Sequence, residues 1–77
     1  METLKATVTS LGKGPRGQFA IASSEALEDS ITISLSPHVW VESQRPEPGD
    51  QVHLSDLRKT QRGWRAMCGR LWRPSDE

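Results

Sequence analysis

The chain is poor in the residues that give small proteins covalent links or membrane anchors. It has one cysteine, Cys68, so an internal disulfide is excluded and a reducing compartment is expected. Its first residues contain no apolar segment typical of a secretory signal. Nowhere does the chain approach the roughly 18 apolar residues needed to span a bilayer. We therefore expect a cytoplasmic protein with no membrane partner.

Metal-ligating and catalytic groups are also scarce. The soft ligands are His38, His53 and Cys68, and their spacings match no common zinc motif. No histidine stands beside Cys68 to activate it, and a cysteine that follows Ala66 and Met67 in a strand is typical of small core residues. We expect no metal, no cofactor and no enzymatic activity, because no acid–base or nucleophile constellation is present.

The apolar content is low, at 34% of 77 residues. A chain of this length is enough for one domain and not for two, and at this size only about 60% of the unfolded surface is buried. Because the apolar residues recur in ordered patterns, the composition still favours a globular chain. We expect a single domain over residues 1–77 that ends in a polar tail over 74–77.

The charges cancel overall but are separated along the chain. Ten basic and ten acidic residues give a formal net charge of zero. Seven acidic residues and one arginine lie between residues 25 and 56, whereas six basic residues and no acidic one lie between 57 and 75. A basic surface can hold polyanions even when the net charge is zero, although a solvated strand with scattered arginines gives the same pattern.

Five segments alternate between apolar and polar residues with the period of a half-buried strand. They cover residues 4–10, 18–23, 30–36, 51–58 and 63–72. A Gly/Pro-rich stretch over 12–17 and a turn over 59–63 predict hairpins between the first and the last two segments. We expect a core that contains Val8, Phe19, Ile21, Ile31, Ile33, Leu35, Val52 and Leu54.

The stretch between the third and fourth segments predicts a short helical turn. Ser36 is a suitable N-cap and Pro37 a suitable first helical residue, and Trp40 is expected to plug one end of the core. Gly69 is a candidate bulge that switches the alternation of the last strand. Trp64 is more consistent with the core than with the surface, and Trp72 remains open between the two.

This order of elements favours a small five-stranded antiparallel barrel of the OB type. Closure removes the exposed strand edges that a short all-β chain would otherwise carry. An SH3-like barrel is the alternative, because it has a similar length and number of strands.

The layout also resembles the cold-shock family of OB-fold proteins over nearly the whole chain. That family opens with a strand, a Lys/Gly-rich turn and the segment Lys-Gly-Phe-Gly-Phe-Ile, and residues 16–21 here read Arg-Gly-Gln-Phe-Ala-Ile. Its next strand runs into serine, as residues 32–36 do. Residues 49–52 resemble the Gly-x-x-Val step that opens the fourth strand of many OB domains, and the basic hairpin over 58–63 leads to the last strand. The resemblance implies an OB barrel.

The base-stacking aromatics of the cold-shock family are missing at the matching positions. Those positions hold Gln18, Ala20, Thr32 and Ser34. Because stacking on an aromatic side chain is worth about 1–3 kcal/mol per base, the resemblance implies the fold and not cold-shock RNA chaperoning.

Two hypotheses for function follow. The first is a non-catalytic module that binds single-stranded nucleic acid, RNA or DNA, across its basic fourth and fifth strands and the first hairpin loop. Arginine binds phosphate in two-pronged fashion and indoles stack on bases; the candidate residues are Lys13, Arg16, Arg58, Lys59, Arg62, Arg65, Arg70, Trp72 and Arg73. The second is an adaptor that binds a protein partner through complementary acidic and basic surfaces. Nothing in the sequence indicates the oligomeric state.

Overall fold

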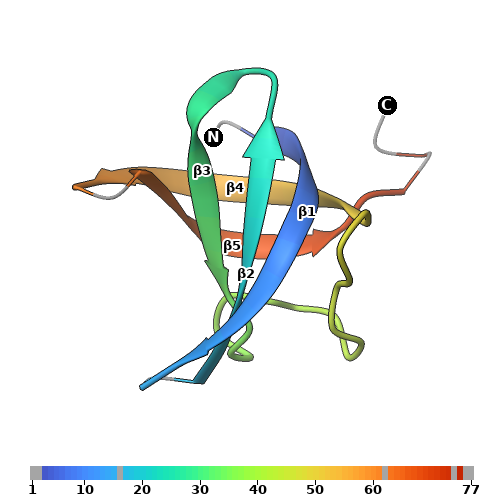
Figure 1. Cartoon of the computed structure of the whole chain (residues 1–77). Helices are drawn as coiled ribbons and strands as arrows, with labels where there is room; N and C mark the ends of the chain where they lie inside the picture. The colour runs from blue at the N-terminus through green and yellow to red at the C-terminus, as the bar shows by residue number, and fades with distance from the viewer. Residues whose placement is uncertain (1–2, 16, 62, 74, 76–77) are drawn as a thin grey trace.

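The chain folds into a closed all-β barrel in the computed structural model (Figure 1). The structure describes residues 3–15, 17–61, 63–73 and 75. The strands that it describes there are β1 (Thr3–Gly14), β2 (Gly17–Ser24), β3 (Leu27–Ser34), β4 (Gln51–Thr60) and β5 (Gly63–Leu71). Each of them overlaps one of the five ranges predicted from the alternation of apolar and polar residues. In Figure 1, β1 to β3 cross the β4–β5 ribbon at a steep angle.

The strands follow the order β1-β2-β3-β5-β4 around the barrel, and β4 closes on β1. The pairings β1–β2, β2–β3, β4–β5 and β1–β4 are antiparallel, whereas β3 pairs with β5 in parallel through Ile31–Trp64 and Ile33–Ala66. The expectation of a purely antiparallel sheet is therefore wrong. A ring of five strands has an odd number of neighbouring pairs, so strand directions cannot alternate all the way round and at least one pair must be parallel.

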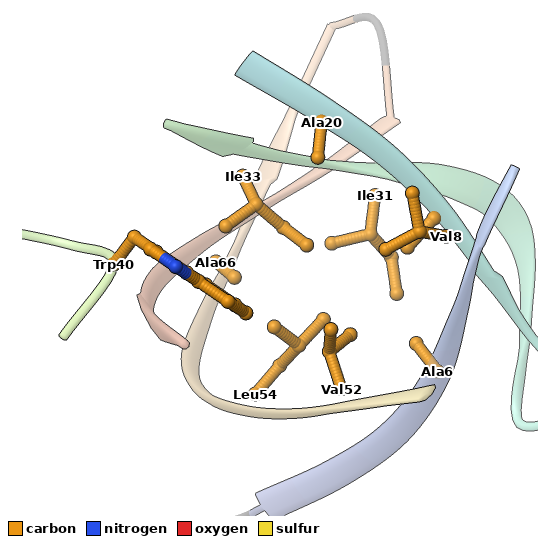
Figure 2. Close-up of a cluster of buried hydrophobic side chains, with 10 residues drawn as sticks. Ala6, Val8, Ala20, Ile31, Ile33, Trp40, Val52, Leu54 and Ala66 are labelled. Atoms are coloured by element: carbon orange, nitrogen blue, oxygen red, sulfur yellow. The ribbon is translucent and has the colours of Figure 1, made fainter. Parts of the chain in front are cut away.

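The core lies inside the barrel and is built largely from β3 and β4 (Figure 2). Ile31, Ile33, Val52 and Leu54 are fully buried and point toward a common centre. These four and Val8 confirm most of the predicted core, and Leu35 packs against it while partly buried.

Strand β2 faces the opposite way to the prediction. Ala20 and Ala22 are fully buried, whereas Phe19 and Ile21 are half-buried and lie outside the core cluster. The register explains this, because Ala20 lies opposite Ile33 and Ala22 lies opposite Ile31. The two isoleucines of β3 already fill the narrow interior, and only small side chains fit beside them at native packing density. The expected core positions of Phe19 and Ile21 are therefore wrong.

The predicted helical turn after β3 does not become a helix. The amides of Val39 and Trp40 both donate to the carbonyl of Ser36, at 3.0 and 2.9 Å, which makes one turn. The chain then leaves the helical path, because Val39 and Val41 exchange backbone hydrogen bonds with Gly69 of β5. Trp40 is 4% exposed and belongs to the core, as expected of a plug (Figure 2). Among the described residues there is no helix of the length and apolar character needed to cross a membrane.

Strand β5 changes its alternation between Ala66 and Gly69, which are both buried although they are three residues apart. The change lies opposite Asp56 of β4, a non-glycine residue with a φ of 53°. Gly69 makes room for its neighbours, since a Cβ there would lie 3.0 Å from Leu54 and 3.3 Å from Trp40. Leu71 then packs against the core, as expected. The predicted bulge at Gly69 is wrong, because β4 and β5 pair through Gly69 without a shift of register.

Candidate nucleic-acid interface

The predicted basic residues do not form one surface. Arg58, Lys59 and Arg65 lie near the tip of the β4–β5 hairpin, whereas Arg70, Trp72 and Arg73 lie at its other end. Arg65 and Arg70 are five residues apart, which is about 17 Å at about 3.3 Å per residue of strand. Lys13 lies in the β1–β2 hairpin, and Arg16 and Arg62 fall outside the described residues.

Near the hairpin tip, two arginines face each other across neighbouring strands. Arg58 of β4 and Arg65 of β5 are direct cross-strand partners, and Thr32 of β3 is the partner of Arg65 on its other side. The side chain of Arg58 is 66% exposed and lies 3.6 Å from the Asp56 carboxylate. Arg65 is exposed and forms no ion pair with any described residue. Because like charges directly opposite each other destabilise a sheet, this pair has a cost in the free protein.

The same row continues across β3 onto β2, where apolar side chains face outward. Thr32 pairs with Ile21, so the row runs Ile21, Thr32, Arg65, Arg58 over four neighbouring strands. Side chains of cross-strand partners lie on one face of a sheet. Ile21 therefore shares the outer face with the two arginines.

Phe19 extends this surface along β2. Its partner on β1 is Gly12, and a Cβ built at Gly12 would collide with the Phe19 ring, closest to its Cζ atom. The ring therefore lies across the β1 backbone where a side chain is missing, and it is half-buried. We call the surface formed by Phe19, Ile21, Thr32, Arg58 and Arg65 the arginine face.

Lys59 and Trp64 make contacts with other residues of the barrel. Lys59 forms an ion pair with Asp29 at the start of β3, and its ammonium lies 5.2 Å from the centre of the Trp64 ring. Trp64 is partly buried and packs against the core, which agrees with the interpretation favoured from the sequence. Both side chains thus support the hairpin tip from its inner side.

The other end of the β4–β5 ribbon carries a second cationic surface around Trp72. Lys5 of β1, His53 of β4 and Arg70 of β5 form one row of cross-strand partners. The Lys5 ammonium lies 4.8 Å from the centre of the Trp72 ring, and the His53 and Trp72 rings lie 5.5 Å apart at 33°. We call Lys5, His53, Arg70 and Trp72 the tryptophan face.

Arg73, which follows Trp72 in the chain, forms an ion pair with an acidic residue and is not counted in the tryptophan face. Its guanidinium donates to the Glu42 carboxylate at 2.8 Å, in the connection between β3 and β4. This pair joins the basic end of the chain to the acidic middle. The acidic residues Asp29, Glu42 and Asp56 therefore each lie against a basic residue of the same chain.

A groove of about 300 Å³ opens beside the β1–β2 hairpin. It is lined by Leu11, Gly12, Lys13, Gln18, Leu35 and Arg45. Arg45 donates to the Gln18 side-chain oxygen at 2.5 Å across it. Since side chains alternate along a strand, Lys13 and Gln18 point to the other side of the hairpin from Phe19. The groove is therefore separate from the arginine face.

The sequence did not reveal Phe19, Ile21, Lys5 or His53 as members of these surfaces. A usable signal for Phe19 was the pair of glycines in β1, since Gly12 and Gly14 both lie under its ring. Lys5 and His53 meet only because β1 closes the barrel against β4, and a pairing of this kind leaves no local signal.

Among the described residues, no three His, Cys, Asp or Glu side chains come together in a way that could hold a metal ion. Comparison with protein-family models, with curated proteins and with solved structures finds no match to this chain. The two cationic faces are therefore the features of the molecule from which we infer its function.

Proposed function

We propose that this chain is a non-catalytic module that binds single-stranded nucleic acid, RNA or DNA, on its arginine face. The observation that carries the proposal is the row Ile21, Thr32, Arg65, Arg58, in which two exposed arginines face each other beside an outward apolar residue. A phosphate group placed between two guanidinium groups relieves their repulsion and accepts charge-assisted hydrogen bonds. In the free protein the repulsion between Arg58 and Arg65 lowers the stability of the fold, and a bound polyanion would offset this repulsion.

The architecture supports the same choice of ligand. A closed five-stranded barrel with a parallel β3–β5 pair is compatible with an OB-like fold of the kind that cold-shock domains have. OB domains bind oligonucleotides on the face of strands 2 and 3 and on the loops that follow strands 1 and 4. The arginine face lies over β2, β3, β5 and β4, so it includes the two strands that carry the ligand face of OB domains.

The outward-facing side chains of β2, Phe19 and Ile21, offer an apolar contact for bases. Phe19 is one aromatic ring, and stacking on one ring is worth about 1–3 kcal/mol per base. Ile21 adds an apolar aliphatic neighbour without hydrogen-bonding groups that could read a sequence. We therefore expect binding that is driven mainly by phosphate contacts and that discriminates little between sequences.

The test is a titration of labelled oligonucleotides by fluorescence anisotropy at about 50 and about 200 mM salt, the range over which phosphate contacts weaken steeply. The variant is Arg65→Gln, and its matched control is Arg45→Gln, which removes the same charge outside the arginine face. We expect Arg65→Gln to weaken binding of all sequences alike and Arg45→Gln to leave it unchanged. Equal losses in the two variants would mean that only the overall charge matters.

The folded state provides an independent check on Arg65→Gln. Removing one arginine of a like-charged pair should stabilise the protein by up to about 1 kcal/mol, and less in salt because the side chains are exposed. A variant that binds more weakly while being at least as stable cannot owe its weaker binding to unfolding. If the wild-type protein forms no oligonucleotide complex at low salt, the proposal fails and the protein-adaptor alternative is favoured.

A further inference from the structure

The tryptophan face has the composition of a second anion-binding surface. Lys5 and Arg70 flank His53 in one cross-strand row, so two permanent cations and an imidazole lie side by side on three strands. The adjacent row holds Thr3, Ser55 and Cys68, which are all neutral. On the other side, Thr7 pairs with Gln51, whose carbonyl accepts the Trp72 amide at 2.9 Å. Charged side chains of one sign thus lie among neutral polar ones.

Trp72 acts here as a positioning residue. Its ring contacts both the Lys5 ammonium and the His53 imidazole. A cation over an indole face is attracted by the ring quadrupole, so the ring holds Lys5 beside His53. Trp72 thus restricts the Lys5 side chain before an anion binds, so less side-chain entropy is lost on binding.

A weakly charged stretch of the β4–β5 ribbon joins the two faces. Both lie on the outer side of the β4–β5 ribbon, about 17 Å apart along β5 at about 3.3 Å per residue. Between them lie the partners Ser55 and Cys68, with short side chains. The acidic residue on this stretch is Asp56, and its carboxylate lies 3.6 Å from Arg58. A flexible polyanion can therefore pass from one face to the other over Ser55 and Cys68, because the Asp56 carboxylate is paired with Arg58.

We propose that a bound single strand continues from the arginine face along the outer side of the β4–β5 ribbon to the tryptophan face, where Lys5 and Arg70 hold a further phosphate. This inference rests on the proposed function and adds to it the direction of the strand and the length of nucleic acid required. Arg70 donates one N–H to the Leu71 carbonyl at 3.2 Å, and its guanidinium has further N–H donors with which it can bind a phosphate.

An acidic polypeptide is the competing class of ligand for such a path. Nucleic acid is favoured because it carries a flat aromatic base next to each phosphate, and the path begins at Phe19 and Ile21, which are half-buried, outward-facing and apolar. An acidic peptide made of carboxylate side chains has no apolar or aromatic group to pack against these two residues. An oligoglutamate peptide is therefore the probe for the alternative.

The test is a residue-resolved NMR titration of the full chain, labelled with ¹⁵N, with oligothymidylates of about 4 and about 12 nucleotides, within the range of site sizes of OB domains. The Thr32 amide reports on the arginine face and the Trp72 indole N–H reports on the tryptophan face. The Trp40 indole N–H, which donates to the Gln44 carbonyl at 2.8 Å, serves as an internal reference. We expect the longer oligomer to shift both reporters and to leave the reference in place.

The outcomes separate the two proposals. If the Thr32 amide shifts and the Trp72 indole does not, the path is wrong while the proposed function stands. If neither shifts, the proposed function itself fails. If oligoglutamate shifts the Trp72 indole as strongly as the oligonucleotide does, the tryptophan face is a surface for acidic proteins and the inference is overturned.

A charge variant tests whether the path is continuous. Lys5→Gln should reduce the log–log salt slope of the longer oligomer by about 0.7, the value for one phosphate of a single strand, and should leave the short oligomer unaffected. Arg45→Gln removes the same charge away from the path and should change neither. An equal effect of Lys5→Gln on both lengths would mean that the two faces bind separately, which contradicts a continuous path.

Discussion

Replacing Ile33 by alanine is expected to remove a large part of the stability of the domain. Ile33 is fully buried and lies opposite Ala20 on β2 and Ala66 on β5. The change deletes three carbon atoms, and about 0.8 kcal/mol for each gives a transfer cost of about 2.4 kcal/mol. The cavity adds about 24 cal/mol per Å³, and the two neighbouring alanines cannot extend into it. We expect a loss of about 3–4 kcal/mol, out of the roughly 5–15 kcal/mol that domains possess.

The matched control is Ile21→Ala, which makes the same chemical change on the outer face of β2. Ile21 is half-buried and lies outside the core cluster, so we expect a loss of about 1 kcal/mol or less. Urea denaturation followed by circular dichroism gives both values, and the slope with urea should be the same in the two variants. Equal losses, or a larger loss for Ile21→Ala, would show that β2 faces the other way. The arginine face would then lose its apolar half.

Three further predictions concern single side chains. Gly63→Ala should cost about 1–3 kcal/mol in urea denaturation, because Gly63 has a φ of 128° and a Cβ there would lie 2.8 Å from the Ser30 carbonyl oxygen. Trp40→Ala should cost about 3–5 kcal/mol and lower Tm strongly, because it empties one end of the core. Phe19→Ala should weaken oligonucleotide binding by about 1–3 kcal/mol without changing its salt dependence, because stacking releases few counterions.

The strands and most of the core could be predicted because they depend on local patterns. Ile31 and Ile33 alternate with polar residues within one segment, and Val52 and Leu54 do so in another. Such alternation is produced by burial of one face of a strand, so it reports on each strand separately. The Gly/Pro-rich stretches then indicate where one strand ends and the next begins.

The orientation of β2 could not be predicted, because both of its faces carry apolar residues and either could be the buried one. Phe19 and Ile21 on one face compete with Ala20 and Ala22 on the other, and hydrophobicity alone selects the larger pair. The barrel selects the smaller pair, because Ile31 and Ile33 already occupy the interior opposite them. The decisive quantity is the volume left inside the barrel, and a single strand carries no information about it.

The grouping of the candidate site depends on pairings between distant segments. Arg58 and Arg65 belong to one hairpin, so their meeting follows from the turn between them. Lys5 and His53 meet through the closure of the barrel, and the register of that contact is non-local. The separation of Arg65 from Arg70 follows from the length of β5, and the sequence therefore suggested one basic surface where the structure has two.

The salt dependence of binding in the double variant Arg58→Gln/Arg65→Gln tests the central claim most directly. Each phosphate neutralised on a single strand contributes about 0.7 to the slope of log affinity against log salt concentration. If the two arginines hold phosphates, the slope of the double variant should be smaller than that of the wild type by about 1.4. A slope equal to that of the wild type would show that the strand does not lie between these arginines, and it would contradict the account.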